Sequence, residues 1–254
     1  MSSSVRLNEV ERFIQINNEV SVSEISEKRG ITEETVRRDL DKLVHKGIIE
    51  RVHGGAIWVK DSDINKSEID YYKRQAMNIK EKRKIALIAK DLIKSKRTIF
   101  CDSSSTCIET LKLLKDETEI VVVTNSCEIF KEINIYKPNL ISTGGIFNQN
   151  SLSYQGNVAK DTIKKYNAEL AIIGSRGLDI NAGATDSYDN EFEIKKEMID
   201  RAKEVALLVD NSKFDRIAFI KLTDLEDIDY IITDKKPSSR WVDFCNKNHI
   251  KLLF

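Results

Sequence analysis

Residues 21–59, SVSEISEKRGITEETVRRDLDKLVHKGIIERVHGGAIWV, contain the signals of two short helices joined by a tight turn and followed by a hairpin. Ser23 is a candidate N-cap for a first helix over 24–28, because its hydroxyl can accept a hydrogen bond from a free N–H group of the first turn. Gly30 suits the left-handed backbone that ends many helices. Thr32 is the candidate N-cap of the second helix. The stretch therefore predicts a helix-turn-helix.

The second helix has two chemically different faces when its residues are placed at intervals of about 100°. One face is apolar and is expected to be buried; it carries Val36, Leu40, Leu43 and Val44. The opposite face presents cations and hydrogen-bond donors; it carries Thr35, Arg38, Lys42 and His45. Strands are predicted over 48–52 and 56–59, with the turn at His53-Gly54-Gly55. Together these elements predict a winged helix-turn-helix, whose second helix fits the major groove of DNA.

DNA contact is predicted for the outward face of the second helix, its N-terminal cap and the hairpin. The candidate residues are Thr32, Thr35, Arg37, Arg38, Lys42, Arg51, His53 and Gly54. Residues 1–60 carry ten Lys and Arg and ten Asp and Glu, so the domain has no net charge that attracts DNA. A cationic helix face is often simply solvated, and a winged helix used only for protein contact is a further alternative. The order of the motifs, rather than the charge, favours DNA binding.

Two motifs in this region resemble the DeoR family of bacterial transcription regulators. The helix-turn-helix motif comprises Arg6, Val10, Ile14, Thr32, Thr35, Val36, Arg37, Arg38, Asp39 and Leu40, and the wing is similar over residues 51–56. The resemblance implies a repressor of sugar catabolism. It also implies that the C-terminal domain senses a phosphorylated sugar or a related metabolite.

The composition is that of a globular protein with a hydrophobic core: 254 residues, 41% hydrophobic and 32% charged, with 41 basic and 41 acidic side chains. This balance argues against a protein that coats polyanions, so any nucleic-acid binding must be local. Four cysteines without a CxxC pair and only three histidines predict no metal site, and we expect no cofactor. There is no apolar run of membrane length and no signal-peptide pattern. We expect a cytoplasmic protein that does not bind membranes.

The chain is predicted to divide into a winged helix-turn-helix domain over 1–60, a partly helical linker over 61–80 and an effector-binding domain over 81–254. In the last segment, short apolar runs alternate with helical stretches. The predicted strands are 98–102, 119–124, 140–144, 170–175, 205–210, 230–234 and 250–254, and the predicted helices between them are 106–115, 126–132, 157–165, 189–203 and 238–247. Such alternation indicates a parallel sheet covered by helices on both faces. The predicted fold class is α/β, with a Rossmann-like effector domain.

Small, polar or charged residues follow five of the predicted strands, where open parallel sheets bind their ligands. The candidate effector-binding residues are Asp102, Ser103, Ser104, Ser105, Thr106, Thr124, Asn125, Gly144, Gly145, Gly174, Arg176, Gly177 and Lys213. Hydroxyls and backbone N–H groups at a helix N-terminus favour an anion, and Arg176 and Lys213 would supply the charge that opposes a phosphate. The alternatives are that the hydroxyls only cap a helix and that each cation pairs with a neighbouring carboxylate.

The family resemblance continues through this segment. FCDSSST resembles the family's phosphate loop, although Ser104 stands where glycine is frequent. VTNS, STGG, IIGSRGLD and LVDNSKF follow in the family's order, as do Glu191 and Lys195, one helical turn apart. The resemblance therefore adds Glu191 and Lys195 to the effector-binding set.

This segment is also similar to sugar-phosphate isomerases of the ribose-5-phosphate type, so an isomerase-like enzyme is the alternative function. Asp102, Asp186, Glu191 and Lys213 would then be the acid–base groups. We predict no catalytic residues, because the winged helix gives a purpose for binding without turnover. The expected partners are double-stranded operator DNA and a phosphorylated sugar, and the expected assembly is a homodimer or homotetramer, as is usual for such DNA-binding proteins.

Overall fold

The computed structural model describes residues 3–17, 19–45, 49–52, 54–58, 71–135, 137–187 and 189–254. The contacts divide the chain into two compact units, Met1–Met77 and Asn78–Phe254. The domain boundaries predicted at residues 60 and 81 lie on either side of this division. Within the described ranges, no helix combines the length and the apolar character needed to cross a membrane.

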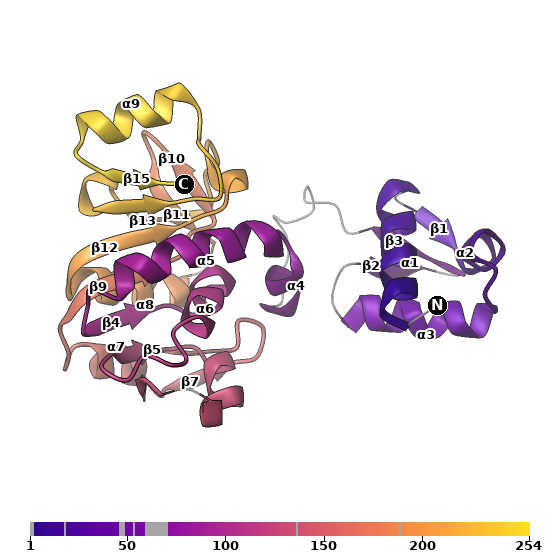
Figure 1. Cartoon of the computed structure of the whole chain (residues 1–254), viewed down its shortest axis with the longest axis horizontal. Helices are drawn as coiled ribbons and strands as arrows, with labels where there is room; N and C mark the ends of the chain where they lie inside the picture. Colours follow the sequence, from indigo (N-terminus) through magenta and orange to yellow (C-terminus); the bar gives the residue numbers. More distant parts are fainter. Residues whose placement is uncertain are drawn as a thin grey trace. The chain divides into compact units, whose positions relative to one another are not determined.

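The first unit combines helices with a small antiparallel sheet (Figure 1). Its described elements are α1 (Ser3–Asn17), β1 (Glu19–Ser21), α2 (Val22–Arg29), α3 (Glu33–His45), β2 (Ile49–Val52), β3 (Gly55–Trp58) and α4 (Tyr71–Ala76). The strand order is β1-β3-β2, and both pairings are antiparallel. Helix, turn, helix and hairpin thus follow one another as the sequence predicts. Of the predicted linker, residues 61–70 lie outside the described ranges, and α4 follows them.

The apolar faces of α1 and α3 form the core of this unit. Val10 and Ile14 of α1 and Val36 and Leu40 of α3 are fully buried, and they share one cluster with residues of α2 and the sheet. Val44 was expected in the same stripe but is 37% exposed. The buried face of α3 is therefore narrower near its C-terminal end than the helical period indicates.

The start of α2 differs from the prediction. Ser21, not Ser23, caps the helix: its hydroxyl accepts a hydrogen bond from the Glu24 N–H group, at 3.1 Å. The Glu24 carboxylate in turn accepts from the Ser21 N–H group, at 2.7 Å. This reciprocal capping box satisfies two N–H groups at once, which a cap at Ser23 could not do. The predicted end is confirmed, because Gly30 adopts the left-handed conformation with φ at 61°.

A buried ion pair joins the first and third helices. Asp39 of α3 is fully buried, and its two oxygens accept hydrogen bonds from Arg6 of α1, Oδ2 from Nε at 2.6 Å and Oδ1 from Nη2 at 3.1 Å. Burial alone would raise the pKa of Asp39, but the Arg6 hydrogen bond and charge lower it below the ordinary value. Asp39 is thus held ionised in the interior, and it fixes the angle between α1 and the helix that carries the predicted DNA-contact face.

The second unit is built on a parallel sheet. Among its described residues, the strand order is β15-β14-β12-β9-β4-β5-β6, and every pairing is parallel. The strands are β4 (Thr98–Cys101), β5 (Val121–Thr124), β6 (Asn139–Ser142), β9 (Ala168–Ile173), β12 (Ala202–Leu208), β14 (Tyr230–Ile232) and β15 (Lys251–Leu253). Each lies within or beside one of the seven predicted strands. The α/β class with a Rossmann-like sheet is therefore confirmed.

Helices cover this sheet. Buried side chains of α7 (Asn157–Ile163), α8 (Asp189–Asp200) and α9 (Ser239–Lys247) form one cluster with inward residues of the strands, with Trp241 fully buried. Helices α5 (Ile79–Ile93) and α6 (Ser105–Lys112) lie in front of the sheet in the view of Figure 1. The predicted helix over 126–132 is instead the 3₁₀ helix η2 (Glu128–Ile135). Two further 3₁₀ helices, η3 (Asn211–Lys213) and η4 (Leu225–Asp227), occur later in the chain.

Two small antiparallel sheets were not predicted. One pairs β7 (Ile146–Asn148) with β8 (Ser153–Gln155), and the other has the described order β10 (Gly177–Asp179), β11 (Gly183–Asp186), β13 (Ile220–Thr223). These strands have only three or four residues each, which is too short for a periodic pattern to distinguish a strand from a loop. They matter for the site, because β11 ends at Asp186.

We expect Asp39→Asn to destabilise the first unit, because Arg6 then loses its charged partner. The cost should be about 1–3 kcal/mol, as for other buried hydrogen-bonding groups whose partner is removed. Since the folded-state pKa of Asp39 is lowered, the wild-type advantage should be complete above the pKa of the unfolded state and should vanish as the pH falls through the folded-state pKa. Thermal unfolding between pH 2 and 7 measures this. Asp41→Asn, on the exposed side of the same helix, is the matched control, and an equal loss in both variants would contradict the role of the ion pair.

Candidate functional site

The outward face of α3 carries cations that are exposed and partly neutralised. The Arg38 side chain is 74% exposed, with Nε 3.3 Å from Oε1 of Glu34. Arg37 Nη2 lies 2.7 Å from Oε2 of Glu33. Exposed pairs of this kind contribute about 0–1 kcal/mol, so DNA phosphates or base edges can replace the glutamates at little cost. The face suits local DNA contact without a general attraction for polyanions.

The remaining predicted DNA-contact residues surround this face. Thr32 is exposed directly before α3, and its hydroxyl accepts from the Thr35 N–H group at 3.4 Å, as expected for an N-cap. Lys42 Nζ lies 3.5 Å from the buried Asp39. In the hairpin, Arg51 and Gly54 are exposed, and Gly54 has φ at 80°. His53 lies outside the described residues, as does the side chain of His45.

In the second unit, the carboxyl ends of β4 and β9 lie next to each other at the point where the strand order reverses. β5 and β6 follow on one side of β4, whereas β9, β12, β14 and β15 lie on the other. Asp102 directly follows β4 and Gly174 directly follows β9. Doubly wound sheets bind their ligands at such a switch point, outside the carboxyl ends of the strands.

Asp102 organises the first loop. It is fully buried, and its Oδ1 accepts from the Ser104 N–H group at 2.9 Å while Oδ2 accepts from the Gly174 N–H group at 3.1 Å. Ser104 then caps α6, its hydroxyl accepting from the Cys107 N–H group at 3.3 Å. A Cβ atom at Gly174 would lie 2.4 Å from Oγ of Ser104. The two loops therefore meet so closely that only glycine fits at residue 174.

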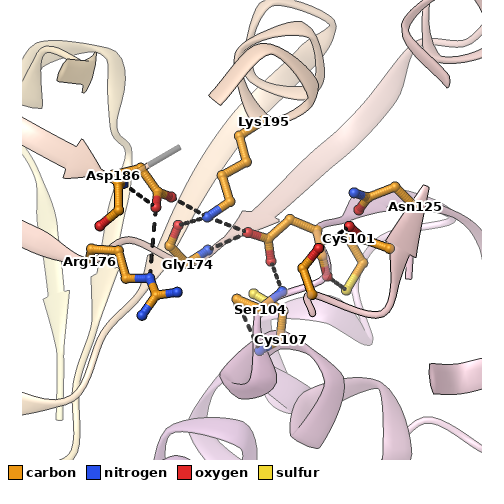
Figure 2. A network of polar contacts seen from close by, with 12 residues as sticks. Cys101, Ser104, Cys107, Asn125, Gly174, Arg176, Asp186 and Lys195 are labelled. Carbon is orange, nitrogen blue, oxygen red and sulfur yellow. Dashed lines mark hydrogen bonds and ion pairs between the residues drawn. The ribbon is translucent and has the colours of Figure 1, made fainter. Parts of the chain in front are cut away.

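Lys195 joins these loops to a third element. It extends from α8, and Nζ lies 2.5 Å from Oδ2 of Asp186, 3.2 Å from Oδ2 of Asp102 and 3.0 Å from the Gly174 carbonyl oxygen, to which it donates (Figure 2). All three residues are at least 95% buried. One ammonium group thus binds β4, β9, β11 and α8 together.

The charges of this cluster stabilise one another. Burial alone would lower the pKa of Lys195, but the carboxylates of Asp186, Asp102 and Glu191 raise it above the ordinary value. Burial alone would raise the pKa of Asp186, but Lys195 and then Arg176 lower it. Lys195 therefore stays protonated and Asp186 ionised around neutral pH. Neither group is suited to exchanging a proton with a substrate, which requires a pKa near the working pH.

Arg176 and Glu191 complete the cluster. Arg176 lies in the loop after β9, and its Nε is 3.9 Å from Oδ1 of Asp186 (Figure 2). Its backbone N–H group donates to the Thr185 carbonyl oxygen at 2.9 Å, which holds the loop against β11. Glu191 is 97% buried in α8, and its charge acts on Lys195. The structure thus brings Asp102, Ser104, Gly174, Arg176, Glu191 and Lys195 of the predicted set into one network.

The other predicted effector-binding residues have structural contacts of their own. Ser103, Ser105 and Thr106 are buried at the N-terminal end of α6. Asn125 donates through Nδ2 to the Tyr154 carbonyl oxygen at 3.2 Å, and Thr124 accepts from the Ser126 N–H group at 3.1 Å, so both hold the turn after β5.

Three glycines and one lysine of the predicted set lie further along the same edge. Gly144 and Gly145 have φ at 60° and 117°. A Cβ atom at Gly177 would lie 2.4 Å from the Arg216 carbonyl oxygen. Lys213 lies in η3, and its charge acts on Asp210, whose pKa burial would raise but Lys213 and the Ser212 hydrogen bonds lower.

Asp186 belongs to the same network, through its contact with Lys195, but it is absent from the predicted effector-binding set. The sequence marked it only as an acid–base candidate of the alternative enzyme, because the short β11 was not predicted. No group of three or more His, Cys, Asp or Glu side chains suited to a metal ion occurs within the described ranges.

Residues 6–62 match the family described as the DeoR-like helix-turn-helix domain, and residues 77–235 match the one described as the DeoR C terminal sensor domain. The chain belongs to the DeoR family. The similar HTH-type transcriptional regulator YulB of Bacillus subtilis, named as uncharacterized, is 34% identical over 90% of this chain and 88% of its own length.

Two further relatives carry names that state a role. The L-fucose operon activator of Haemophilus influenzae is 28% identical over 94% of this chain and 95% of its own length. The glycerol-3-phosphate regulon repressor of Escherichia coli K12 is 26% identical over 99% of both chains. This DeoR-family chain is a DNA-binding transcription regulator with a sensor domain, and not an enzyme.

We expect Lys195→Met to destabilise the second unit strongly, because Asp102 and Asp186 would be left as buried carboxylates without their shared cation. Breaking a buried pair in this way costs about 3–5 kcal/mol. Urea unfolding followed by circular dichroism measures the loss. Lys196→Met is the control, since the neighbouring Lys196 is exposed and pairs with the exposed Asp200 at 2.9 Å; it should cost less than about 0.5 kcal/mol. Similar stability of the two variants would contradict the central role of Lys195.

Proposed function

We propose that the protein represses an operon for sugar catabolism and is released from its operator by a phosphorylated sugar or related metabolite. The observation that carries this proposal is the set of groups that meet at the switch point. The N-terminal end of α6 supplies N–H groups and hydroxyls, and a buried network of carboxylates and cations lies next to it. These two sets of groups suit the two ends of a phosphorylated polyhydroxy compound.

The N-terminal end of α6 suits the phosphate. Ser105 and Thr106 form the first turn, where the helix dipole and free N–H groups favour an anion. Arg176 is the cation nearest to the rim of the network, with 17% of its side chain exposed. Lys195, in contrast, is already balanced by two carboxylates, so it adds little net attraction for an anion. The phosphate is therefore assigned to α6 and Arg176.

The carboxylates suit the hydroxyl groups of the ligand. An ionised carboxylate only accepts hydrogen bonds, and sugar hydroxyls donate them. Asp186 is held ionised by Lys195, and the Asp102 carboxylate lies 3.2 Å from the same ammonium group, at the same strand ends as the first turn of α6. A ligand with a phosphate at one end and hydroxyls at the other is thus favoured over inorganic phosphate.

The direction of regulation rests on the family. The names of its members in the comparison include repressors and an activator; we propose repression, because more of these relatives are named as repressors than as activators. We also infer that the protein acts in the cytoplasm on double-stranded operator DNA, as a homodimer or homotetramer. Linkage requires reciprocity: an effector that weakens DNA binding must itself bind less tightly to the DNA-bound protein.

Arg38→Ala should weaken operator binding by about 1–3 kcal/mol, the usual contribution of one good base contact. Arg38 extends from the outward face of α3 and is the more exposed of the two adjacent arginines. Electrophoretic mobility shifts with the operator and with a scrambled sequence measure the loss and its sequence dependence. The control is Arg12→Ala, an exposed arginine of α1 in the same unit. Operator affinity equal to that of the wild type would show that the recognition face is misassigned.

Arg176→Gln should weaken the response to the effector and leave operator binding without effector unchanged. The effector is first found by thermal-shift screening against sugar phosphates, since a ligand of the folded state raises the melting temperature. It is then titrated into operator complexes of each variant, where a coupling of about 1–3 kcal/mol changes affinity roughly 5–150-fold.

Lys213→Gln tests the other predicted cation in the same titration. Lys137→Gln is the control, because Lys137 precedes β6 at the opposite edge of the sheet and pairs with the exposed Asp116. If no sugar phosphate changed operator affinity in the wild type, the sensor proposal would be wrong.

A further inference from the structure

The loop that leads into β13 carries the most exposed large hydrophobic side chain of the described residues. Phe219 is 90% exposed and Ile217, two residues earlier, is 67% exposed. Soluble proteins rarely hold an aromatic ring fully in water, and neighbouring exposed apolar side chains mark contact surfaces. We call residues 215–221, with the sequence DRIAFIK, the 215–221 face.

The backbone of this face is held in place, so the two apolar side chains project from a rigid support. The Ala218 N–H group donates to Oγ1 of Thr185 at 2.8 Å, and the Arg216 N–H group donates to the Leu178 carbonyl oxygen at 3.4 Å. β13, which begins at Ile220, is paired with β11. Ordered apolar side chains lose little conformational entropy when a partner covers them.

We propose that the 215–221 face is a self-association surface: a second copy of this chain binds to it with the same face, and a two-fold axis at Ala218 relates the two copies. The sequence of the face is complementary to itself. When a second copy runs antiparallel with Ala218 opposite Ala218, Ile217 lies opposite Phe219, and Asp215 lies opposite Lys221. A two-fold contact requires this kind of self-complementarity, because the same surface serves both copies.

The charges agree with this arrangement. Asp215, Arg216 and Lys221 are exposed around the apolar pair, which gives an apolar centre with a polar rim, as in protein interfaces. Asp215 Oδ1 accepts from Nε1 of Trp241 at 2.9 Å, so its carboxylate is fixed in position. The rim pairs are exposed and weak, and the burial of Phe219 and Ile217 supplies the anchor.

The few available cations of the DNA-binding unit explain why a contact between two copies, formed by the second unit, would strengthen operator binding. Each recognition helix is partly neutralised by Glu33 and Glu34, so one copy offers few free cations to DNA. Two linked copies bind an operator far more tightly than one, since the second contact becomes intramolecular. The surface of the described first unit offers no comparable anchor: its exposed large hydrophobic residues are Val44 and Tyr72, at 37% and 40%.

The 215–221 face is also continuous with the proposed effector site. Asp186 pairs in register with Ile220 across β11 and β13, and the hydroxyl of Thr185, the preceding residue, accepts the hydrogen bond of the Ala218 N–H group. Asp186 is the carboxylate nearest to Lys195. A ligand that moves Asp186 would therefore act on the backbone of the association surface, and this link rests on the proposed function.

The test is the mass of the full chain in solution, measured by analytical ultracentrifugation without DNA or effector. We expect the wild type to associate at micromolar concentration and Phe219→Asp to raise the dissociation constant at least about tenfold, as for the loss of a central anchor. Phe147→Asp is the matched control: Phe147 is also exposed, at 52%, but lies on β7. It should leave the mass unchanged, and circular dichroism confirms that both variants fold.

A second variant tests the position of the axis. A cysteine at residue 218 would meet its own copy, so Ala218→Cys should give a covalent dimer under mild oxidation. Cys101, Cys107 and Cys245 are buried and Cys127 is partly exposed, so the wild type, treated in the same way, gives the baseline that the Ala218→Cys dimer must exceed. A monomeric wild type, an unchanged mass for Phe219→Asp, or a loss of mass with Phe147→Asp instead would each overturn the proposal. None of these outcomes depends on operator or effector binding, so failure here is distinguishable from failure of the proposed function.

Discussion

The second unit depends on one ammonium group placed among carboxylates. Lys195 contacts Asp102 at the end of β4, the Gly174 carbonyl at the end of β9 and Asp186 at the end of β11. A separate loop follows the carboxyl end of each parallel strand, and the hydrogen bonds of the sheet do not determine how these loops contact one another. The buried ammonium group of Lys195 determines that arrangement. The same contacts also keep Lys195 and Asp186 in their charged forms, which leaves these two groups little capacity for acid–base chemistry.

The first unit uses the same device for a different purpose. Asp39 is buried beneath α3 and receives two hydrogen bonds from Arg6, so the charge sets the position of the helix rather than contacting a ligand. Buried ion pairs add little net stability compared with well-packed apolar residues, but their directional hydrogen bonds select one geometry. In both units, a charge in the interior positions elements that a proposed contact uses: α3 for DNA, and the strand ends around Lys195 for the proposed effector site.

The sequence predicts those parts of the structure in which apolar residues follow a clear pattern. Seven continuous apolar runs predict the strands of the parallel sheet, and the helical spacing of Val36 and Leu40, with Arg38 on the opposite side, predicts the two faces of α3. The cap of α2 was misplaced because a serine at 21 and one at 23 are both acceptable locally, and only the reciprocal bond with Glu24 decides between them. Asp186 and β11 were missed for a related reason. A strand of four residues with a glycine has no pattern of its own, and tertiary contacts with β10 and β13 define it.

The small sheet of β10, β11 and β13 connects the proposed effector site with the proposed association surface. On one side, Asp186 of β11 belongs to the charged network around Lys195. On the other side, Asp186 pairs with Ile220 of β13, which is part of the 215–221 face. The register shift between Ala184 and Thr185 makes this ladder irregular at the residue that holds Ala218, and irregular pairing is the place where a short strand can change its path at low cost. A ligand hydroxyl that replaced part of the Lys195–Asp186 contact would change the force that this contact exerts on β11, and the irregular pairing at Thr185 would let the strand shift. Two copies joined at residues 215–221 would then be respaced together, which changes the distance between two recognition helices without any motion inside either DNA-binding unit.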